Sequence, residues 1–357
     1  MLEYKKLECK GEERMELHFG RTNGQADAAI DELMKLAGGI HYPDMVREMI
    51  LAALKAGQET HRRADLKLMN STVKEMRYTT KVFSAYHDVR KVTVFGSART
   101  KPGQPLYTMA QRFGKKLAEQ GFMVITGGGP GIMQAVNEGA GPEHSFGVNI
   151  RLPFEQRPNP VLEGNPRNIS YKYFFNRKVA FLKESDAVAL FPGGFGTLDE
   201  AMETLTLVQT GKRNPLPLVL MDEVGGSYWT HWSRFLEKEL LARGYIDSAD
   251  FDLFERVDSV EGAFEKIAQF YRRYHSLRYV GKELVIRMTS PLDAEQVESL
   301  QNQFADILTS SGGIRPSGPL PEEADEPEVY YLPRLVVDFS RERFGRLKTL
   351  IDAINRA

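Results

Sequence analysis

Residues 187–205 read AVALFPGGFGTLDEAMETL and contain the strongest structural signal in the chain. An apolar run ends at Phe191, Pro192 and three glycines follow, and a helical pattern of apolar residues begins at Leu198. A strand, a glycine turn and a helix in this order direct backbone N–H groups at an anion. We therefore expect the turn at 193–197 to hold an anionic group.

Length and composition limit the possible classes of protein. At 357 residues the chain is too long for one ordinary core, which predicts two or three domains. It is 42% hydrophobic and 27% charged with a net charge of −1, which is typical of a soluble globular protein and disfavours a dedicated nucleic-acid binder. No apolar run reaches the roughly 20 residues that cross a bilayer. The N-terminus, MLEYKKLECKGEER, lacks the apolar stretch of a signal peptide, and the single cysteine excludes an intrachain disulfide. We expect a cytoplasmic protein that has neither a membrane nor nucleic acid as its partner.

Five short apolar runs alternate with helical patterns through the middle of the chain. Their spacing indicates βαβ units, in which parallel strands are joined by right-handed helical crossovers. The pattern predicts an α/β fold, a Rossmann-like doubly wound parallel sheet, over residues 90–278. The expected strands are 91–96, 122–126, 146–150, 186–191 and 216–221, and the expected helices include 106–120 and 260–278.

The two flanking segments have a different character. Residues 1–89 are polar and predict a helical N-terminal extension. Residues 279–357 predict a small α+β module, with strands at 283–288 and 334–339 and helices at 294–308 and 344–354. Within this module, residues 318–329 (GPLPEEADEPEV) carry five acidic residues and three prolines, which is typical of an exposed loop.

Three glycine-rich turns follow the predicted strands, at 96–99, 127–131 and 192–197. None is a P-loop or a complete G-x-G-x-x-G motif, and each by itself is explained equally well by a tight turn. Three such turns at the carboxyl edge of one sheet indicate a phosphate-bearing small molecule. The candidate binding residues are Gly96, Ser97, Gly128, Gly129, Gly193, Gly194, Gly196 and Thr197.

Thr197 and Glu200 have two possible roles. Their T-x-x-E spacing at a helix start is that of a capping box, in which Glu200 would only bond the backbone N–H of Thr197. Alternatively, both side chains turn away from the apolar stripe of the helix and face the glycine-lined edge. In that case Glu200 would stand beside a bound sugar phosphate, and the pattern leaves both alternatives open.

Arg177 lies on the apolar stripe of a predicted helix, three residues after Phe174 and four before Phe181. A guanidinium at such a position reaches the surface, pairs with a carboxylate or binds a ligand. We expect the next residue, Lys178, to be an exposed charge and keep it as a possible site residue. The seven histidines have no metal-binding spacing, so neither a metal nor another cofactor is expected.

These residues resemble the signature of the LOG (Lonely Guy) family, long misannotated as lysine decarboxylases. Residues 192–200, PGGFGTLDE, match its P-G-G-x-G-T-x-x-E motif, and Arg177-Lys178 resembles its R-K helix motif. The turns at 96–97 and 127–129 resemble its nucleotide-binding turns. The resemblance covers roughly residues 90–275, and the two flanking extensions resemble those of longer bacterial nucleotide 5′-monophosphate nucleosidases.

The resemblance implies a phosphoribohydrolase, which uses water to cleave a nucleoside 5′-monophosphate into free base and ribose 5-phosphate. It puts Arg177 and Glu200 at the catalytic centre and the 193–197 turn on the 5′-phosphate, and it implies at least a homodimer. The resemblance does not decide which base is preferred, or whether the reaction serves cytokinin production or purine salvage. It also leaves open the role of the two extensions, for which binding of an effector nucleotide that controls hydrolysis is one alternative.

A non-catalytic carrier of a nucleotide or of molybdenum cofactor, on the same fold, is the alternative. The first turn, GSART at 96–100, also differs from the pattern of many relatives. Whether this turn contacts the base of a bound nucleotide is therefore undecided. Arg99 either contacts the phosphate or has no role in binding.

Overall fold

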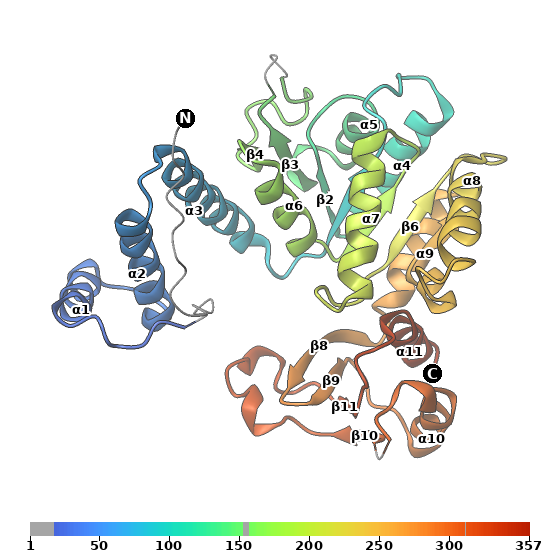
Figure 1. The fold of residues 1–357 in the computed structure, drawn as a ribbon. Helices are drawn as coiled ribbons and strands as arrows, with labels where there is room; N and C mark the ends of the chain where they lie inside the picture. The colour runs from blue at the N-terminus through green and yellow to red at the C-terminus, as the bar shows by residue number, and fades with distance from the viewer. Residues whose placement is uncertain (1–17, 153–156, 311) are drawn as a thin grey trace, which may run out of the picture. The chain divides into compact units, whose positions relative to one another are not determined.

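The computed structural model describes residues 18–152, 157–310 and 312–357 of the chain. The chain divides into two compact units, residues 1–74 and 75–357 (Figure 1). In the first unit, the buried side chains of Arg47 and Asp27 pair at 3.0 Å and join α1 to α2. The helical extension is thus confirmed for the described residues, and residues 1–17 lie outside them. Its helices are α1 (Gln25–Ala37), α2 (Pro43–Glu59) and α3 (Arg63–Phe83), the last of which continues into the second unit.

A seven-stranded sheet forms the centre of the second unit, with strand order β4-β3-β2-β1-β5-β6-β7. Every pairing in it is parallel. The five predicted strands are confirmed, and β4 and β7 add one strand at each edge. The strands are β1 (Lys91–Phe95), β2 (Met123–Thr126), β3 (Ser145–Ile150), β4 (Asn168–Tyr171), β5 (Ala187–Leu190), β6 (Leu218–Met221) and β7 (Glu255–Val257).

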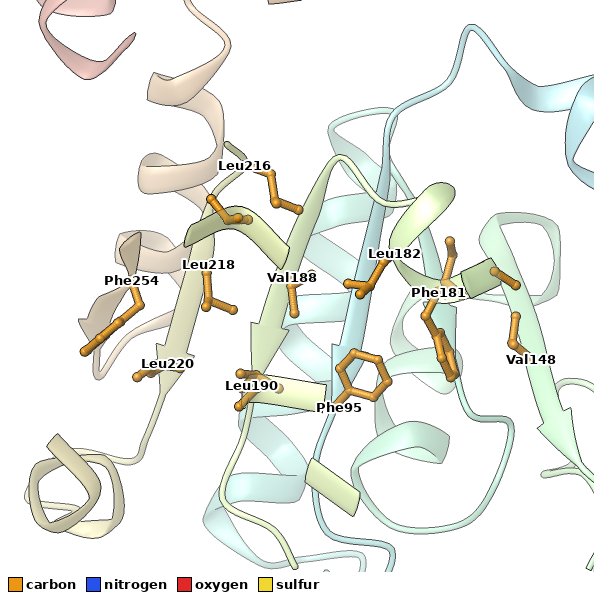
Figure 2. Packing of buried hydrophobic residues seen from close by; sticks show 14 of the residues in the cluster. Phe95, Val148, Phe181, Leu182, Val188, Leu190, Leu216, Leu218, Leu220 and Phe254 are labelled. Carbon is orange, nitrogen blue, oxygen red and sulfur yellow. The ribbon is translucent and has the colours of Figure 1, made fainter. Parts of the chain in front are cut away.

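Helices cover both faces of this sheet because side chains alternate between the faces along each strand. Val188 and Leu190 of β5 pack with Phe95 and Phe181 on one face (Figure 2), whereas Ala189 packs on the other. The predicted doubly wound α/β fold is therefore confirmed. The first face is covered by α6 (Phe174–Lys183), α7 (Phe195–Gln209) and α8 (Tyr228–Phe235), and the second by α4 (Pro105–Glu119), α5 (Ile132–Ala140) and α9 (Val260–Phe270).

The C-terminal module is a four-stranded antiparallel sheet, in the order β10-β11-β9-β8, with its own apolar core. This confirms the predicted α+β module, but two predicted helices were too long. The helix expected over 260–278 ends at Phe270, because residues from Tyr274 onward pair with β9. The helix expected over 294–308 ends at Gln303. The elements are β8 (Tyr274–Val280), β9 (Glu283–Met288), α10 (Ala294–Gln303), β10 (Ile314–Ser317), β11 (Arg334–Val337) and α11 (Phe344–Arg356).

Shorter helical turns complete the second unit, and the proposed domain boundary at 278–279 falls within β8. None of the helices in the described parts of the chain is both long and apolar enough to cross a membrane. The shorter turns are 3-10 turns at Ser84–Tyr86, Pro142–His144, Ser248–Leu253, Ala305–Ile307, Pro321–Glu323 and Pro327–Val329, and a π-helical turn at Leu236–Leu241.

The acidic segment 318–329 is not simply an exposed loop. Glu323 is fully buried and accepts a hydrogen bond from Nε of Arg287 at 2.8 Å and one from Nε of Arg334 at 3.2 Å. Arg287 and Arg334 are themselves buried on β9 and β11. The prediction of a solvated loop was wrong at this position, because two buried arginines elsewhere in the module need a counter-charge.

Candidate active site

Three glycine turns meet at the carboxyl ends of the neighbouring strands β2, β1 and β5. The backbone N–H of Ser97, in the first turn, donates to the carbonyl of Pro192 in the third at 3.1 Å. The N–H of Ile132, which begins α5, donates to the carbonyl of Ser97 at 3.0 Å. The turns thus form one continuous rim, as the sequence predicted from their position after the strands.

This rim opens into a cavity of about 680 Å³. Helices α6 and α7 lie on the same face of the sheet (Figure 1). They supply the remaining polar side chains of the cavity, those of Arg177, Thr197 and Glu200. Most of the predicted site residues line it together, namely Gly96, Ser97, Arg99, Arg177, Gly193, Gly194, Gly196, Thr197 and Glu200.

Gly128 and Gly129 do not line the cavity, and Gly127 takes their place. The carbonyl of Gly128 accepts from the backbone N–H of Asn159 at 2.8 Å, and that of Gly129 accepts from the Asn159 side chain at 3.2 Å. Both glycines are buried beneath the turn. These contacts from Asn159, which is about 30 residues further along the chain, turn Gly128 and Gly129 away from the cavity. A local sequence pattern therefore could not predict which of the consecutive glycines faces the cavity.

The three glycines of the third turn differ in what their surroundings require. A Cβ on Gly193 would lie 2.1 Å from Oγ1 of Thr197, so packing forbids a side chain there. A Cβ on Gly194 or Gly196 would have no atom within 4 Å, and neither residue has a positive φ. Gly194 is the N-cap of α7, a position at which glycine is favoured over alanine, so capping accounts for it. Gly196 lies inside the first turn, where alanine suits a helix better, and neither packing nor its φ requires a glycine there.

The capping-box interpretation of Thr197 and Glu200 is wrong. Helix α7 begins at Phe195 with Gly194 as its N-cap, so Thr197 already lies inside the first turn. The N–H of Thr197 donates to the carbonyl of Gly194 at 3.0 Å. Glu200, only 3% exposed, lies almost one turn further on and lines the cavity instead.

The Glu200 carboxyl is buried with one oxygen free. Its Oε1 lies 3.4 Å from Nζ of Lys178, and its Oε2 has no hydrogen-bond partner among the described residues. Burial, helped by the neighbouring Glu203 and Asp199 and opposed by Lys178 and Arg177, raises the pKa of Glu200 to about 7. A carboxyl group in this range can exchange a proton near neutral pH.

Arg177 holds its guanidinium between two aromatic rings at the cavity. The guanidinium carbon is 4.9 Å from the ring centre of Phe174 and 5.5 Å from that of Phe181. Its Nε is buried and has no hydrogen-bond partner within the described segments. Burial lowers the pKa of Arg177, although the charges of Glu200 and Asp199 oppose this effect. Binding of a ligand by Arg177 stays a prediction.

Lys178 is not the exposed charge that we predicted. Its side chain is 19% exposed, and its Nζ lies 2.8 Å from Oδ2 of Asp199 and 2.7 Å from Oε2 of Glu203. These carboxylates belong to α7, whereas Lys178 belongs to α6. The pairing depends on how the two helices pack, which a local pattern does not contain.

Glu75, at the C-terminal part of α3, supports α6 and was missed by the sequence reasoning. Its two carboxylate oxygens accept hydrogen bonds from the N–H of Lys172 at 2.9 Å and from the side chain of Asn176 at 2.7 Å. Asn176 is buried in the first turn of α6, next to Arg177. A carboxylate at a helix N-terminus also interacts favourably with the helix dipole. Glu75 therefore orients the helix that carries Arg177 and Lys178.

We predict that Glu200→Gln stabilises the fold at alkaline pH. Because the folded pKa of about 7 exceeds the ordinary value of 4.5, the folded state holds the proton more tightly than the unfolded state does. The parent's free energy of unfolding should therefore fall as the pH rises from about 4.5 to about 7. We expect the variant to be more stable than the parent by about 2 kcal/mol at pH 8 and equally stable at pH 4. Urea unfolding at both pH values measures this, and equal stability at pH 8 would contradict it.

The segment that contains most of the cavity residues is similar to known proteins. Residues 109–267 match a family described as possible lysine decarboxylase. One relative, from Oryza sativa subsp. japonica and named probable cytokinin riboside 5′-monophosphate phosphoribohydrolase LOG4, is 26% identical over 189 residues, which are 51% of this chain and 77% of the relative. Another from the same organism, cytokinin riboside 5′-monophosphate phosphoribohydrolase LOG, is 33% identical over 140 residues, which are 37% of this chain and 56% of the relative.

Among solved structures, the molybdenum cofactor carrier protein of Chlamydomonas reinhardtii is 20% identical and covers 51% of this chain and 97% of its own, with a TM-score of 0.36. This likeness is too low to bear on function. Within the described residues, no group of three or more His, Cys, Asp or Glu side chains is arranged to hold a metal ion.

The segment that matches the family contains the second and third glycine turns, Arg177 and Glu200. Both named relatives carry the LOG name. The resemblance to the LOG family seen in the sequence is therefore confirmed for the middle part of the chain.

Proposed function

We propose that the protein hydrolyses the N-glycosidic bond of a nucleoside 5′-monophosphate to free base and ribose 5-phosphate. The observation that carries the proposal is a cavity in which a buried carboxyl and a guanidinium each have an atom without a partner, Oε2 of Glu200 and Nε of Arg177, among the described residues. Buried polar atoms normally have a hydrogen-bond partner, and the position of these two beside one cavity supports the binding of a polar ligand there. The cytokinin nucleotide named for the relatives is one such substrate.

The start of α7 is the proposed site of the 5′-phosphate. Backbone N–H groups in the first turn of a helix have no partner within the helix, and the helix dipole favours an anion there. No atom lies within 4 Å of where a Cβ of Gly194 or Gly196 would be, so the space beside these two residues is open to a phosphate. Thr197 adds a side chain with a hydroxyl to the lining of the cavity. A phosphate bound here would hold the ribose within reach of Glu200, which lies on the next turn of the same helix.

Glu200 supplies the chemistry in this proposal. Breaking a glycosidic bond develops positive charge on the sugar, which a carboxylate stabilises. A water molecule adds its oxygen to C1′ while the bond from C1′ to the base nitrogen breaks with its electron pair. Ionised Glu200 accepts the proton of that water, and its pKa of about 7 suits this at neutral pH. The departing base takes up a proton from solvent, and Glu200 later releases the proton of the attacking water to solvent. Arg177 binds the phosphate or the sugar and favours the ionised form of Glu200.

The first experiment is a substrate panel of AMP, GMP, IMP, CMP, UMP and isopentenyl-AMP, with release of free base followed by chromatography. Release by the parent and its loss in Glu200→Gln would support the proposal, and the rates would distinguish a cytokinin nucleotide from ordinary nucleotides. Binding of a nucleotide without release by the parent would overturn the proposal in favour of a carrier.

We predict that Gly196→Ala weakens binding of ribose 5-phosphate at least about tenfold, because the new methyl group occupies space that a phosphate would fill. The fold should be as stable as the parent's or more stable by about 0.5 kcal/mol, since alanine suits a helix better than glycine and no atom lies within 4 Å of the new Cβ. Calorimetric titration with ribose 5-phosphate and thermal unfolding measure the two effects.

The matched control for this variant is Gly318→Ala, which also places a Cβ in open space but lies in the C-terminal module. It should leave the affinity for ribose 5-phosphate unchanged. Equal affinity in both variants would show that the phosphate does not bind beside Gly196.

A further inference from the structure

We propose that Lys178 is a positioning residue. It holds Oε1 of Glu200, so that Oε2, which has no partner among the described residues, stays free in the side chain that lines the cavity. The proposal rests on the proposed function, in which Glu200 acts on the substrate. It assigns to Lys178 no contact with the substrate, because Lys178 is absent from the cavity lining although its neighbour Arg177 is part of it.

The contacts of Lys178 show why it acts on Glu200. An ammonium group has three N–H donors, and three carboxylates of α7 surround this one. Asp199 and Glu203 lie at 2.8 and 2.7 Å, and Oε1 of Glu200 at 3.4 Å. Two short contacts hold the ammonium in place, and its charge 3.4 Å from Oε1 favours the carboxyl orientation in which Oε1 faces Lys178. Consecutive residues of α6 thus have different partners: Arg177 lines the cavity, and Lys178 pairs with the carboxylates of α7.

The same cluster adjusts the charge of Glu200. The charged groups that act on it are Lys178 and Arg177 from α6 and Asp199 and Glu203 from α7. Lys178 is the larger of the two cationic influences, and it lowers the proton affinity that burial and the two neighbouring carboxylates raise. Without Lys178, Glu200 would hold its proton to a higher pH, and less of the ionised form would be present at neutral pH.

Opposite substitutions in the cluster test this assignment. In Lys178→Met, we expect the acid limb of the pH profile of kcat/KM to move up by about one pH unit, which lowers kcat/KM about tenfold at pH values below the limb. In Glu203→Gln, which removes a negative neighbour, the limb should move down. Lys178→Arg keeps the charge and should restore most of the parent profile. The substrate's own phosphate, with a second pKa near 6, contributes equally to every profile.

The second readout needs no activity. The Glu200 carboxyl is titrated by NMR in protein labelled with ¹³C in its glutamate side chains, and its resonance is assigned by its loss in Glu200→Gln. Midpoints that move up in Lys178→Met and down in Glu203→Gln support the proposal. Midpoints unchanged in both variants would overturn it.

The two readouts separate failure of this inference from failure of the proposed function. A parent protein that releases no base from any nucleotide disproves the function, and the titration then still decides the role of Lys178. An active parent whose pH profile and carboxyl titration are the same in Lys178→Met as in the parent disproves the role of Lys178 alone.

Discussion

Glu200→Gln is expected to lower kcat/KM for nucleotide hydrolysis by about 10³-fold, the usual contribution of a positioned acid–base group. Glutamine has nearly the same shape as glutamate, but it can neither accept a proton nor stabilise positive charge on the sugar. The loss should appear in kcat rather than in KM, since the proposed phosphate contacts at Gly194 and Gly196 remain. Base release under saturating and limiting nucleotide measures the two constants.

The control for this result is Glu138→Gln. Glu138 is a carboxylate of α5 that accepts a hydrogen bond from Tyr107 at 2.9 Å and is not part of the cavity lining. It should keep the parent's kcat. A Glu200→Gln protein that is folded and retains more than about a tenth of the parent's kcat would mean that Glu200 is not the acid–base group.

Glu323→Ala is expected to destabilise the second unit by about 4 kcal/mol, the typical cost of removing one partner from a buried ion pair. It would leave Arg287 and Arg334, with side chains only 4% and 0% exposed, without their shared buried counter-charge. Although burial works to raise it, the pKa of Glu323 is lowered by the N–H of Leu320 and by the two arginines. The parent's advantage should therefore be complete near neutral pH and fade as the pH falls through the acid range.

Urea unfolding at pH 7 and at pH 4 measures the stability of Glu323→Ala, and Glu322→Ala is its matched control. Glu322 is the preceding acidic residue in the same segment and is exposed, so its removal should change the free energy of unfolding by less than about 0.5 kcal/mol. Equal effects of the two substitutions would mean that the segment behaves as a solvated loop.

The interior of the parallel sheet was predictable because its strands carry their own signal. The strands β1, β2, β5 and β6 are short, mostly apolar runs that are buried on both faces, and β3 is buried over its first four residues. The edge strands were not predictable. In β4 the sequence NISY has two apolar residues, and in β7 the sequence ERV has one. They form strands because β3 and β6 offer them unpaired backbone groups.

The same distinction applies to the candidate site, where features defined by neighbouring residues were predictable and features defined by distant partners were not. Gly193 to Thr197, Arg177 and Glu200 were identified because glycine turns after strands and a cation on an apolar stripe are local patterns. The partners of Lys178 and Glu75, and those of Glu323 outside the site, were missed, because they come from other elements. In a linear pattern all three look like ordinary surface charges.

Local spacing in the chain was thus sufficient for the interior strands of the parallel sheet and for the carboxyl-edge location of the site. The family resemblance added Arg177 and Glu200 as the two residues proposed to act on a nucleotide. Packing between elements decided the rest. The packing of α6 against α7 set the proton affinity of Glu200, the segment around Asn159 set which glycine faces the cavity, and the C-terminal module set the environment of Glu323. The physical reason is that burial and ion pairing depend on distances between elements. Those distances are set by the apolar core beneath the helices and not by neighbours along the chain.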